Sequence, residues 1–408
     1  MLKRINLDDL RLGMFIHEFC GSWMEHPFWR AQFLLDQPAQ LSRVRSSGIR
    51  ELWIDTERGL DVADPHAIVH SVDETEREVD HTLASAAAGG PTTLQVELHS
   101  ELEQARKVVR EARPAVLSMF THARLGRAVD VAGASALVDR IRGAVGRNPA
   151  AMLSVARLKQ ADEYTFMHSV AVSGLMIAFA QQLRLSDDEI NKAGMAGLLH
   201  DIGKAKVPDV ILNKPAALTD EEFAQMRRHP EIGHAMLAEQ GQVDSAVLDG
   251  VLHHHERIDG NGYPHRLAGS AVSQIAAMTA LCDVYDAVTS ARVYKPGWDP
   301  AEAVRRMAEW SKTHFDPALF QAFVKTVGIY PIGSLVRMES GRLGVVVEQS
   351  DRSLLSPRVK VFFSTRSQLR IAPEVIDLSR PNVTDRIVGR EDPARWRFND
   401  LETLWQTE

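Results

Sequence analysis

Histidine and aspartate residues, which are common metal ligands, gather between residues 160 and 290 of the chain. His200 and Asp201 are neighbours, and His254 and His255 close a run of three histidines. Imidazole nitrogens and carboxylate oxygens bind divalent transition metals in many proteins. The clustering therefore indicates either a metal site or a set of buried polar groups that bond to one another.

Helical periodicity places His168 on an interior face. It shares a stripe with Val172, Leu175 and Phe179, at offsets of four, seven and eleven residues. Buried ionisable groups need partners, and a cation would satisfy imidazoles and carboxylates together. A single buried histidine is, however, more often a hydrogen-bonded core residue. Spacing alone leaves both interpretations open.

The composition of the 408 residues is that of a globular protein, with 45% hydrophobic and 25% charged residues. The net charge of −7 excludes a general attraction to nucleic acid, so a phosphate-bearing ligand would need local basic side chains or a metal. Cys20 and Cys282 show no pairing pattern, which excludes a disulfide scaffold and a cysteine-based zinc module. With no signal peptide and no apolar stretch long enough for a membrane span, we expect a cytoplasmic protein.

Hydrophobic patterning divides the chain into three regions. Residues 1–95 predict a small β-containing module followed by a partly flexible linker, which begins near residue 73. Residues 96–330 predict helices almost throughout, and the resemblance described below divides them into a helical connector, residues 96–150, and a helical catalytic domain, residues 151–330. Residues 331–408 predict a small β element with a polar tail. The fold class is therefore mainly α.

Local signals place several element boundaries. Ser186 with Glu189, and Thr219 with Glu222, have the spacing of capping boxes that open helices. Three β-rich runs between residues 334 and 363 predict short strands. The helical pattern of residues 100–120 contains Pro114, which would kink or break a helix.

The chemistry-bearing segments together resemble the HD-GYP family, over residues 150–330. HD-GYP proteins are the branch of the HD metallophosphohydrolase superfamily that acts on cyclic dinucleotides. The resemblance implies an HD-type helical bundle as catalytic domain, flanked by a small N-terminal β-containing module and a short C-terminal β element. The N-terminal part is similar to a module of unknown function that is common in Gram-negative bacteria. The matching residues are His168, His200-Asp201-Ile-Gly-Lys204, His229, His254-His255-Glu256-Arg-Ile-Asp259-Gly-Asn-Gly-Tyr263-Pro264, and Asp283 with the following segment through Arg292 and Tyr294-Lys295-Pro.

The resemblance implies a cofactor of two divalent transition-metal ions, Fe or Mn, with Ni and Co also suited to such donors. Some family members bind a third metal through a glutamate one helical turn before the first histidine. That position is Tyr164 here, so we expect two ions. The implied ligands are His168, His200, Asp201 and Asp283 for one ion, and Asp201, His229, His254 and His255 for the other, with Asp201 bridging them.

The implied reaction is hydrolysis of cyclic di-GMP to linear pGpG, GMP or both. Two cations about 3.5–4 Å apart would activate a bridging water to hydroxide and neutralise the phosphoryl oxygens. Asp201 and Lys204 are the implied catalytic residues, and Lys204 would contact the phosphate or help the leaving group. A solvated lysine at the end of a helix is the structural alternative for Lys204.

Five further residues have implied roles and plainer alternatives. Tyr263, Arg292 and Lys295 would bind the substrate, or else serve as a packing residue and two exposed bases. Glu256 and Asp259 would support the ligands from behind. Glu256 would do so by orienting an imidazole N–H, or it would instead accept hydrogen bonds from its loop.

Two other functions compete with catalysis on cyclic di-GMP. The chain could be a catalytically weak receptor or scaffold for cyclic di-GMP, although intact His-Asp and Gly-Tyr-Pro motifs favour turnover. It could also hydrolyse another cyclic dinucleotide, such as cyclic GMP-AMP. Diguanylate cyclases or other signalling proteins are the implied protein partners. The helix of residues 100–120 offers a surface on which a homodimer could form.

Overall fold

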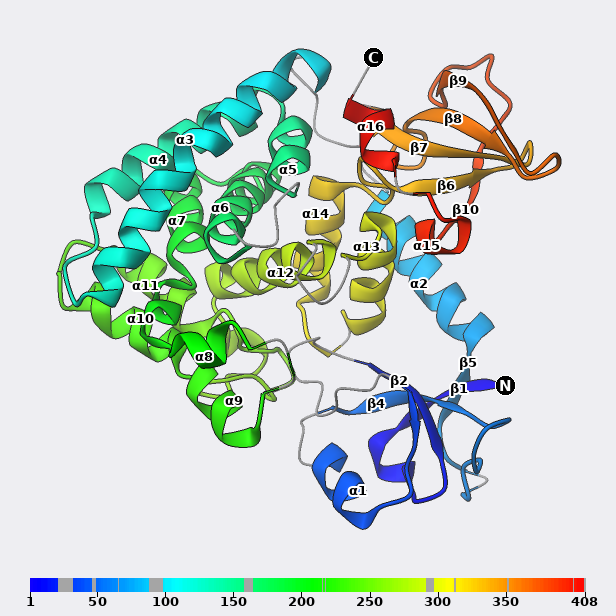
Figure 1. Cartoon of the computed structure of the whole chain (residues 1–408), viewed down its shortest axis with the longest axis horizontal. Coiled ribbons are helices and arrows are strands. Elements are labelled where there is room, and N and C mark those ends of the chain that lie inside the picture. Colours follow the sequence, from blue (N-terminus) through cyan, green and yellow to red (C-terminus); the bar gives the residue numbers. More distant parts are fainter. Residues whose placement is uncertain are drawn as a thin grey trace.

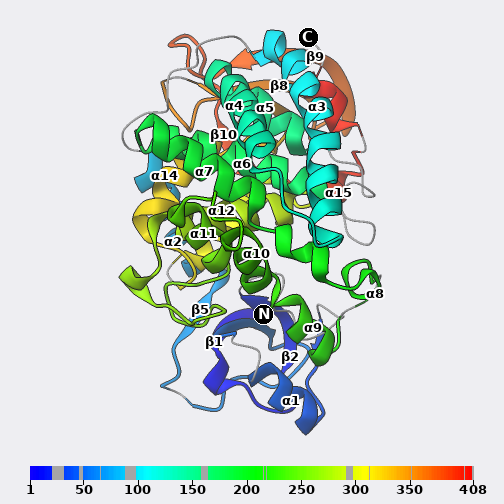
Figure 2. The ribbon, with the colours of Figure 1, turned by 90° about the vertical axis from the view of Figure 1, so that its left-hand side faces the viewer.

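The computed structural model of the chain has a helical body and two five-stranded antiparallel sheets. In Figure 1 most of the helices lie at the left, with the C-terminal sheet at the upper right and the N-terminal sheet at the lower right (Figures 1 and 2). The mainly α prediction, with β elements on both sides, is confirmed. Within the described part of the chain, no helix has the length and apolar character needed to cross a bilayer. The structure describes residues 1–20, 32–45, 49–64, 66–87, 98–157, 164–214, 216, 218–290, 297–311, 313–350, 352–398 and 400–406, without the side chains of 98, 99, 157 and 164–166.

The N-terminal sheet has the strand order β3-β2-β4-β1-β5 and is covered by the short helix α1. Its core consists of apolar side chains from the sheet and α1, including Ile16, Leu52, Ile54 and Val44. The elements are β1 (Leu2–Asn6), β2 (Phe15–Cys20), β3 (Phe33–Leu34), α1 (Pro38–Arg45), β4 (Glu51–Asp55) and β5 (Val69–Ser71).

The prediction of a partly flexible linker was wrong over most of its length, where Val72–Ala87 form helix α2. The helix buries Val79, Leu83 and Ala86, which lie on one face because they are four and three residues apart. This face packs on α13 (Pro300–Trp310) and α14 (Pro317–Val327), so the helix joins the N-terminal sheet to the body. Arg390 of the C-terminal sheet reaches Asp80 on the same helix at 3.9 Å.

The helical body is built around α6 (Tyr164–Gln182), which packs against α5, α7, α12 and α14. Every described side chain from Met167 to Ala180 on this helix is buried, so the helix is enclosed on all sides. The predicted capping boxes at Ser186 and Thr219 are both confirmed. The other helices are α3 (Leu98–Arg124), α4 (Val131–Arg147), α5 (Pro149–Arg157), α7 (Asp187–Leu199), α8 (Asp209–Leu212), α9 (Asp220–Met226), α10 (His229–Ala238), α11 (Ser245–His253) and α12 (Gln274–Thr289), with the 3-10 turn η4 (Ile202–Lys206).

Helices α3 and α4 belong to the same core as the rest of the body. Pro114 lies inside α3, which is 27 residues long in total and is not broken at this proline. The apolar face of α3 covers α4, α5, α6 and η4, which gives this face a partner within the chain. A role in a homodimer therefore stays a prediction without support from this face.

The C-terminal sheet has the strand order β10-β6-β7-β8-β9. Strands β6 (Leu335–Met338), β7 (Arg342–Glu348) and β8 (Arg358–Ser364) confirm the three predicted runs. Strand β9 (Leu369–Asp377) is mostly exposed, which explains why its sequence carries no hydrophobic signal. The sheet is completed by β10 (Ile387–Arg390) and followed by α15 (Pro393–Trp396) and α16 (Leu401–Gln406).

Candidate metal centre

Seven polar side chains converge in the middle of the helical body, and all of them are buried or nearly so. Most stand at helix ends, where the backbone can turn a side chain inward. The seven are His168 on α6, His200 and Asp201 after α7, His229 at the start of α10, His254 and His255 after α11, and Asp283 on α12.

Close backbone packing brings these helix ends together. Gly203, in the turn after Asp201, lies against the first turn of α10. A Cβ atom at this position would stand 2.0 Å from the carbonyl oxygen of His229, so any other residue would force the two segments apart. The glycine of the His-Asp-Ile-Gly-Lys segment thus sets the distance between Asp201 and His229.

The first part of the cluster contains His168, Asp283 and Asp286. His168 Nδ1 lies 2.6 Å from Asp286 Oδ2, and His168 Nε2 lies 2.9 Å from Asp283 Oδ1. A neutral imidazole has one N–H, so it can donate to only one of these two carboxylates. Its other nitrogen then presents a lone pair to an anion, which requires a proton or a metal ion between them.

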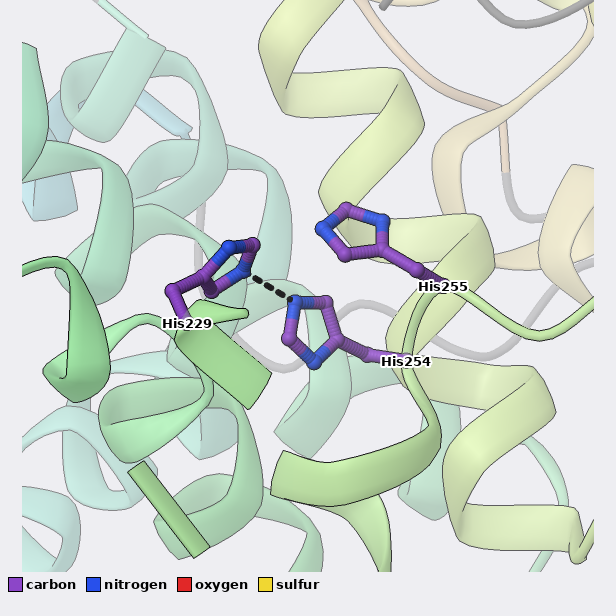
Figure 3. A group of neighbouring side chains, drawn as sticks. All are labelled: His229, His254 and His255. Carbon is purple, nitrogen blue, oxygen red and sulfur yellow. Dashed lines mark hydrogen bonds between the residues drawn. The ribbon is translucent and has the colours of Figure 1, made fainter. Parts of the chain in front are cut away.

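The second part contains His229, His254 and His255, which converge from two segments of the chain (Figure 3). His229 Nδ1 lies 2.8 Å from the carbonyl oxygen of Met226, and His254 Nδ1 lies 2.8 Å from that of Val251. A carbonyl oxygen only accepts, so both Nδ1 atoms carry the hydrogen. In the neutral rings both Nε2 atoms are therefore lone-pair acceptors.

These two Nε2 atoms, of His229 and His254, lie only 3.2 Å apart. The dashed line between them in Figure 3 would be a hydrogen bond only if one ring carried a second proton, whereas in the neutral rings the two lone pairs repel each other. His200 is oriented in the same way, because its Nδ1 lies 2.9 Å from the Gly197 carbonyl oxygen. A backbone carbonyl three residues earlier thus fixes the tautomer of three histidines and directs their Nε2 atoms inward.

Asp201 lies between the two parts of the cluster. Its Oδ2 is 3.4 Å from His200 Nε2 and 3.7 Å from His168 Nε2. Its Oδ1 is 3.2 Å from His229 Nε2 and 3.9 Å from His254 Nε2. One oxygen thus faces each set of histidines. Lys204 Nζ also contacts Oδ2, at 2.5 Å.

The donor atoms fit a bound cation. His200 Nε2, Asp201 Oδ1 and His255 Nε2 are buried, and none has a hydrogen-bond partner among the described residues. Buried polar atoms without a partner are rare in folded proteins, and several together point to a ligand. Three sets have ligand atoms within 4.8 Å of one another: His229, His254 and His255; His168, His200 and Asp283; and His200, Asp201 and His254.

Burial controls the protonation of the histidines. It lowers the pKa of His254 and of His255 well below the ordinary 6.5, and neighbouring imidazoles add to the effect. Burial also lowers the pKa of His229. For His200 burial acts in the same direction, but Asp201 is close enough to raise its pKa above the ordinary value.

The carboxylates stay ionised for the opposite reason. Burial would raise the pKa of Asp201, but Lys204 and His200 hold it well below its ordinary value. Burial would likewise raise the pKa of Asp283, which the hydrogen bond with His168 keeps low. Neutral imidazoles and ionised carboxylates are the protonation states that metal binding requires.

The loop after His255 is shaped by the two acidic residues that were expected to support the ligands. The Glu256 carboxylate accepts the backbone N–H groups of His265 at 2.7 Å and Leu267 at 3.0 Å. Asp259 accepts hydrogen bonds from Arg257 and Asn261. In the described part of the chain neither carboxylate bonds to an imidazole, so Glu256 has the contacts of the loop-acceptor alternative.

The sequence reasoning missed Asp286, which contacts His168 from behind. Its signal was present, since Asp286 follows Asp283 by three residues and lies on the same helical face. Arg292 and Lys295 lie outside the described residues, as does the side chain of Tyr164. Tyr263 is described and only 7% exposed.

Comparison with known proteins identifies the family. Residues 2–134 match a domain of unknown function (DUF3391), and residues 147–319 match the HD domain. A cyclic di-GMP phosphodiesterase of Pseudomonas aeruginosa is 55% identical over 406 residues, 99% of this chain and 96% of that protein. The chain belongs to the HD-GYP family of phosphodiesterases.

Two further relatives match the chain over less than half of its length. The cyclic di-GMP phosphodiesterase response regulator RpfG of Xanthomonas campestris is 38% identical over 182 residues, 42% of this chain and 47% of that protein. The 3′3′-cGAMP-specific phosphodiesterase 1 of Vibrio cholerae is 33% identical over 177 residues, 43% of this chain and 41% of that protein. HD-GYP relatives thus carry the names of two different cyclic dinucleotides.

Proposed function

We propose that this HD-GYP protein hydrolyses cyclic di-GMP to linear pGpG, GMP or both, using two divalent transition-metal ions in the buried cluster. The observation that carries the proposal is the pair of Nε2 atoms of His229 and His254, 3.2 Å apart. Both rings donate their Nδ1–H to a backbone carbonyl, and burial disfavours their protonation. A metal ion is the remaining partner that suits two converging lone pairs.

The proposed ligands divide into two sets that share Asp201. This division is supported by the two oxygens of Asp201, since Oδ2 lies nearer His168 and His200 and Oδ1 nearer His229 and His254. Imidazole and carboxylate donors suit Fe or Mn, and also Ni or Co. One ion would be held by His168, His200, Asp201 and Asp283, and the other by Asp201, His229, His254 and His255.

When bound, such a pair of ions supplies a nucleophile from water at neutral pH and offsets the charge of the phosphodiester. The chain itself orients the donors, through the carbonyl groups behind His200, His229 and His254 and through Asp286 behind His168. Lys204 is half-buried beside Asp201, from which it can reach a phosphate oxygen or the departing ribose oxygen.

The substrate proposal rests on the relative that matches nearly the whole chain, including the N-terminal module, and is named for cyclic di-GMP. Relatives named for cyclic GMP-AMP match only over the catalytic half and at 32–33% identity. Cyclic GMP-AMP is therefore the competing substrate, because it offers the same phosphodiester with one different base.

The test is turnover of cyclic di-GMP by the purified chain, loaded anaerobically with Fe(II) or Mn(II), with products followed by chromatography. We expect pGpG, GMP or both, and faster turnover than with cyclic GMP-AMP in parallel. Asp201→Asn should lower kcat by about 10³-fold or more, above the usual effect of one stabilising group. Asp188→Asn is the matched control, on the exposed first turn of α7.

Tight binding of cyclic di-GMP without turnover, with Fe(II) or Mn(II) and also after loading with Ni(II) or Co(II), would make the chain a receptor. Faster turnover of cyclic GMP-AMP would reassign the substrate while leaving the metal centre intact. Either result would contradict the proposal as stated.

A further inference from the structure

A short column of side chains leads away from the metal centre. The Tyr263 ring stacks on the His255 ring, with centroids 4.7 Å apart and planes inclined by 27°. The Arg227 guanidinium carbon in turn lies 4.3 Å from the centroid of Tyr263. Tyr263 thus connects a proposed metal ligand with an arginine that the sequence reasoning did not single out.

The backbone holds Tyr263 firmly in this place. Its N–H donates to the carbonyl oxygen of His255 at 3.2 Å. A Cβ atom on Gly262 would lie 2.4 Å from Glu256 Cα, so the loop folds against itself as only glycine allows. With its ring in contact with both His255 and Arg227, little of Tyr263 is left for a substrate to cover.

Arg227 carries a positive charge that no described residue neutralises. It lies in the turn between α9 and α10, two residues before His229, and is half-buried. Across the described ranges, its guanidinium forms neither an ion pair nor a hydrogen bond, and its contacts are with the rings of Tyr263 and Phe223. Stacking occupies the face of a guanidinium and leaves its five N–H donors in the plane.

We propose that Arg227 binds the cyclic dinucleotide at a part remote from the phosphodiester that is cut. The inference rests on the proposed function. A cyclic dinucleotide places one phosphate at the metal centre and carries a second phosphate and two bases beyond it. A phosphate oxygen pair and the O6/N7 edge of guanine both accept two parallel N–H bonds from arginine.

The position of Arg227 supports binding at the remote part of the substrate, away from the phosphodiester that is cut. Arg227 contacts Tyr263, and within the described structure no hydrogen bond or ion pair joins its side chain to any of the seven proposed ligands. In a chain of net charge −7, an unpaired cation beside the centre also supplies the local attraction that a dianionic substrate needs.

A purely structural role for Arg227, as a clamp on Tyr263, makes a different prediction. A displaced Tyr263 would disturb His255 and slow every phosphodiester alike. Loss of a remote contact would weaken the binding only of substrates that have a second phosphate and bases to contact. Bis(p-nitrophenyl) phosphate is a phosphodiester without a base or a second phosphate, so it separates the two roles.

The experiment compares Arg227→Gln with Arg228→Gln in the full-length, Mn(II)-loaded chain. Arg228 is the exposed neighbour of the same type and serves as the matched control. For Arg227→Gln we expect the KM for cyclic di-GMP to rise at least about tenfold, the loss typical of a charge-assisted hydrogen bond, with kcat changed less than about twofold. Activity on bis(p-nitrophenyl) phosphate should match the wild type. The KM of Arg227→Lys should lie between those of the wild type and Arg227→Gln, since lysine keeps the positive charge but cannot donate two parallel N–H bonds.

Two results would overturn the inference while leaving the proposed function standing. One is a KM for cyclic di-GMP in Arg227→Gln equal to that of Arg228→Gln. The other is an equal loss on both substrates, which would make Arg227 a clamp. A wild-type chain that does not turn over cyclic di-GMP would sink the proposed function, and this inference with it.

Discussion

The metal centre and the interface between the N-terminal sheet and α13 both bury charged side chains, but they satisfy them differently. In the interface, the Glu309 carboxylate accepts a hydrogen bond from Trp53 Nε1 at 3.0 Å and lies 3.8 Å from the Arg4 guanidinium. Arg306 on the same helix pairs with Glu18. These charges find partners of opposite sign within the protein, as buried charges must.

In the metal centre, acceptor atoms converge on one another instead. His200 Nε2, Asp201 Oδ1 and His255 Nε2 find no hydrogen-bond partner among the described residues. Arg4 Nε in the interface also has no hydrogen-bond partner among the described residues, but the other nitrogens of its guanidinium lie beside Glu309 and Glu78. The interface therefore satisfies its buried charges within the protein, whereas the converging lone pairs of the cluster are an arrangement that a bound cation would satisfy.

The largest effect that separates the two regions should come from adding metal. Mn(II) at about 1,000 times its Kd should raise the free energy of unfolding by about 4 kcal/mol for each of the two proposed ions, because only the folded state presents the site. Denaturant unfolding with and without Mn(II) measures this. Asp201→Asn should lose the increment, and the Asp188→Asn control should keep it. A free energy of unfolding of the wild type that Mn(II) leaves unchanged would contradict the metal assignment.

Removing a partner from the interface should destabilise the chain without touching the metal. Glu309→Ala should lower the free energy of unfolding by about 3 kcal/mol, since it removes the acceptor of the Trp53 indole N–H and leaves the buried Arg4 with Glu78 alone. The Mn(II) increment should stay the same. Glu57→Ala, at a side chain that is 79% exposed, is the control. A loss no greater than that of the control would show that the buried pair contributes nothing.

Asp286 should affect metal affinity without being a ligand. Asp286→Asn keeps the shape of the side chain but weakens its hold on His168 Nδ1. Partners behind a metal ligand typically contribute 10–100-fold in affinity, so we expect a Kd for Mn(II) raised by about that factor. A titration of the metal-free variant measures it, and an unchanged Kd would remove Asp286 from the site.

Acidification should destabilise the metal-free chain. The folded-state pKa values of His254 and His255 lie well below 6.5, and burial lowers that of His314 to about 3. Below pH 6.5 these histidines are therefore protonated in the unfolded chain but not in the folded chain. The free energy of unfolding consequently falls as the pH falls. His200, whose pKa is raised, opposes the trend.

Between pH 7.5 and 5.5 we expect a net loss of about 1–3 kcal/mol, because each suppressed protonation contributes about 1.4 kcal/mol per pH unit. Denaturant unfolding at the two pH values, after treatment with a chelator, measures the loss. His314→Gln should reduce it by about one such contribution. Equal stability at both pH values would mean that these histidines protonate freely in the folded state.

Much of the centre could be predicted from the sequence, because its residues stand in short motifs at helix ends. The capping box at Ser186 and the segment after His200 have local signals that need no knowledge of the fold. The structure brings all seven predicted ligand residues into one cluster, although their role as ligands stays a proposal.

Contacts between distant segments could not be predicted in this way. Trp53 and Glu309 are hydrogen-bonded although they are 256 residues apart in the sequence, and the residues around neither one predict this contact. Helix α2 was missed because Val79, Leu83 and Ala86 are sparse within a polar stretch and become a buried face only against α13 and α14. Arg227 is one of two adjacent arginines in the sequence, and only the folded loop brings Tyr263 to it.

The central claim is that the buried cluster holds two metal ions that share Asp201. The most direct measurement is an equilibrium titration of the metal-free chain with Mn(II), with bound metal counted per chain. We predict two equivalents for the wild type and for Asp188→Asn, and a loss of tight binding at both positions in Asp201→Asn. One equivalent or none in the wild type, or two in Asp201→Asn, would contradict the account.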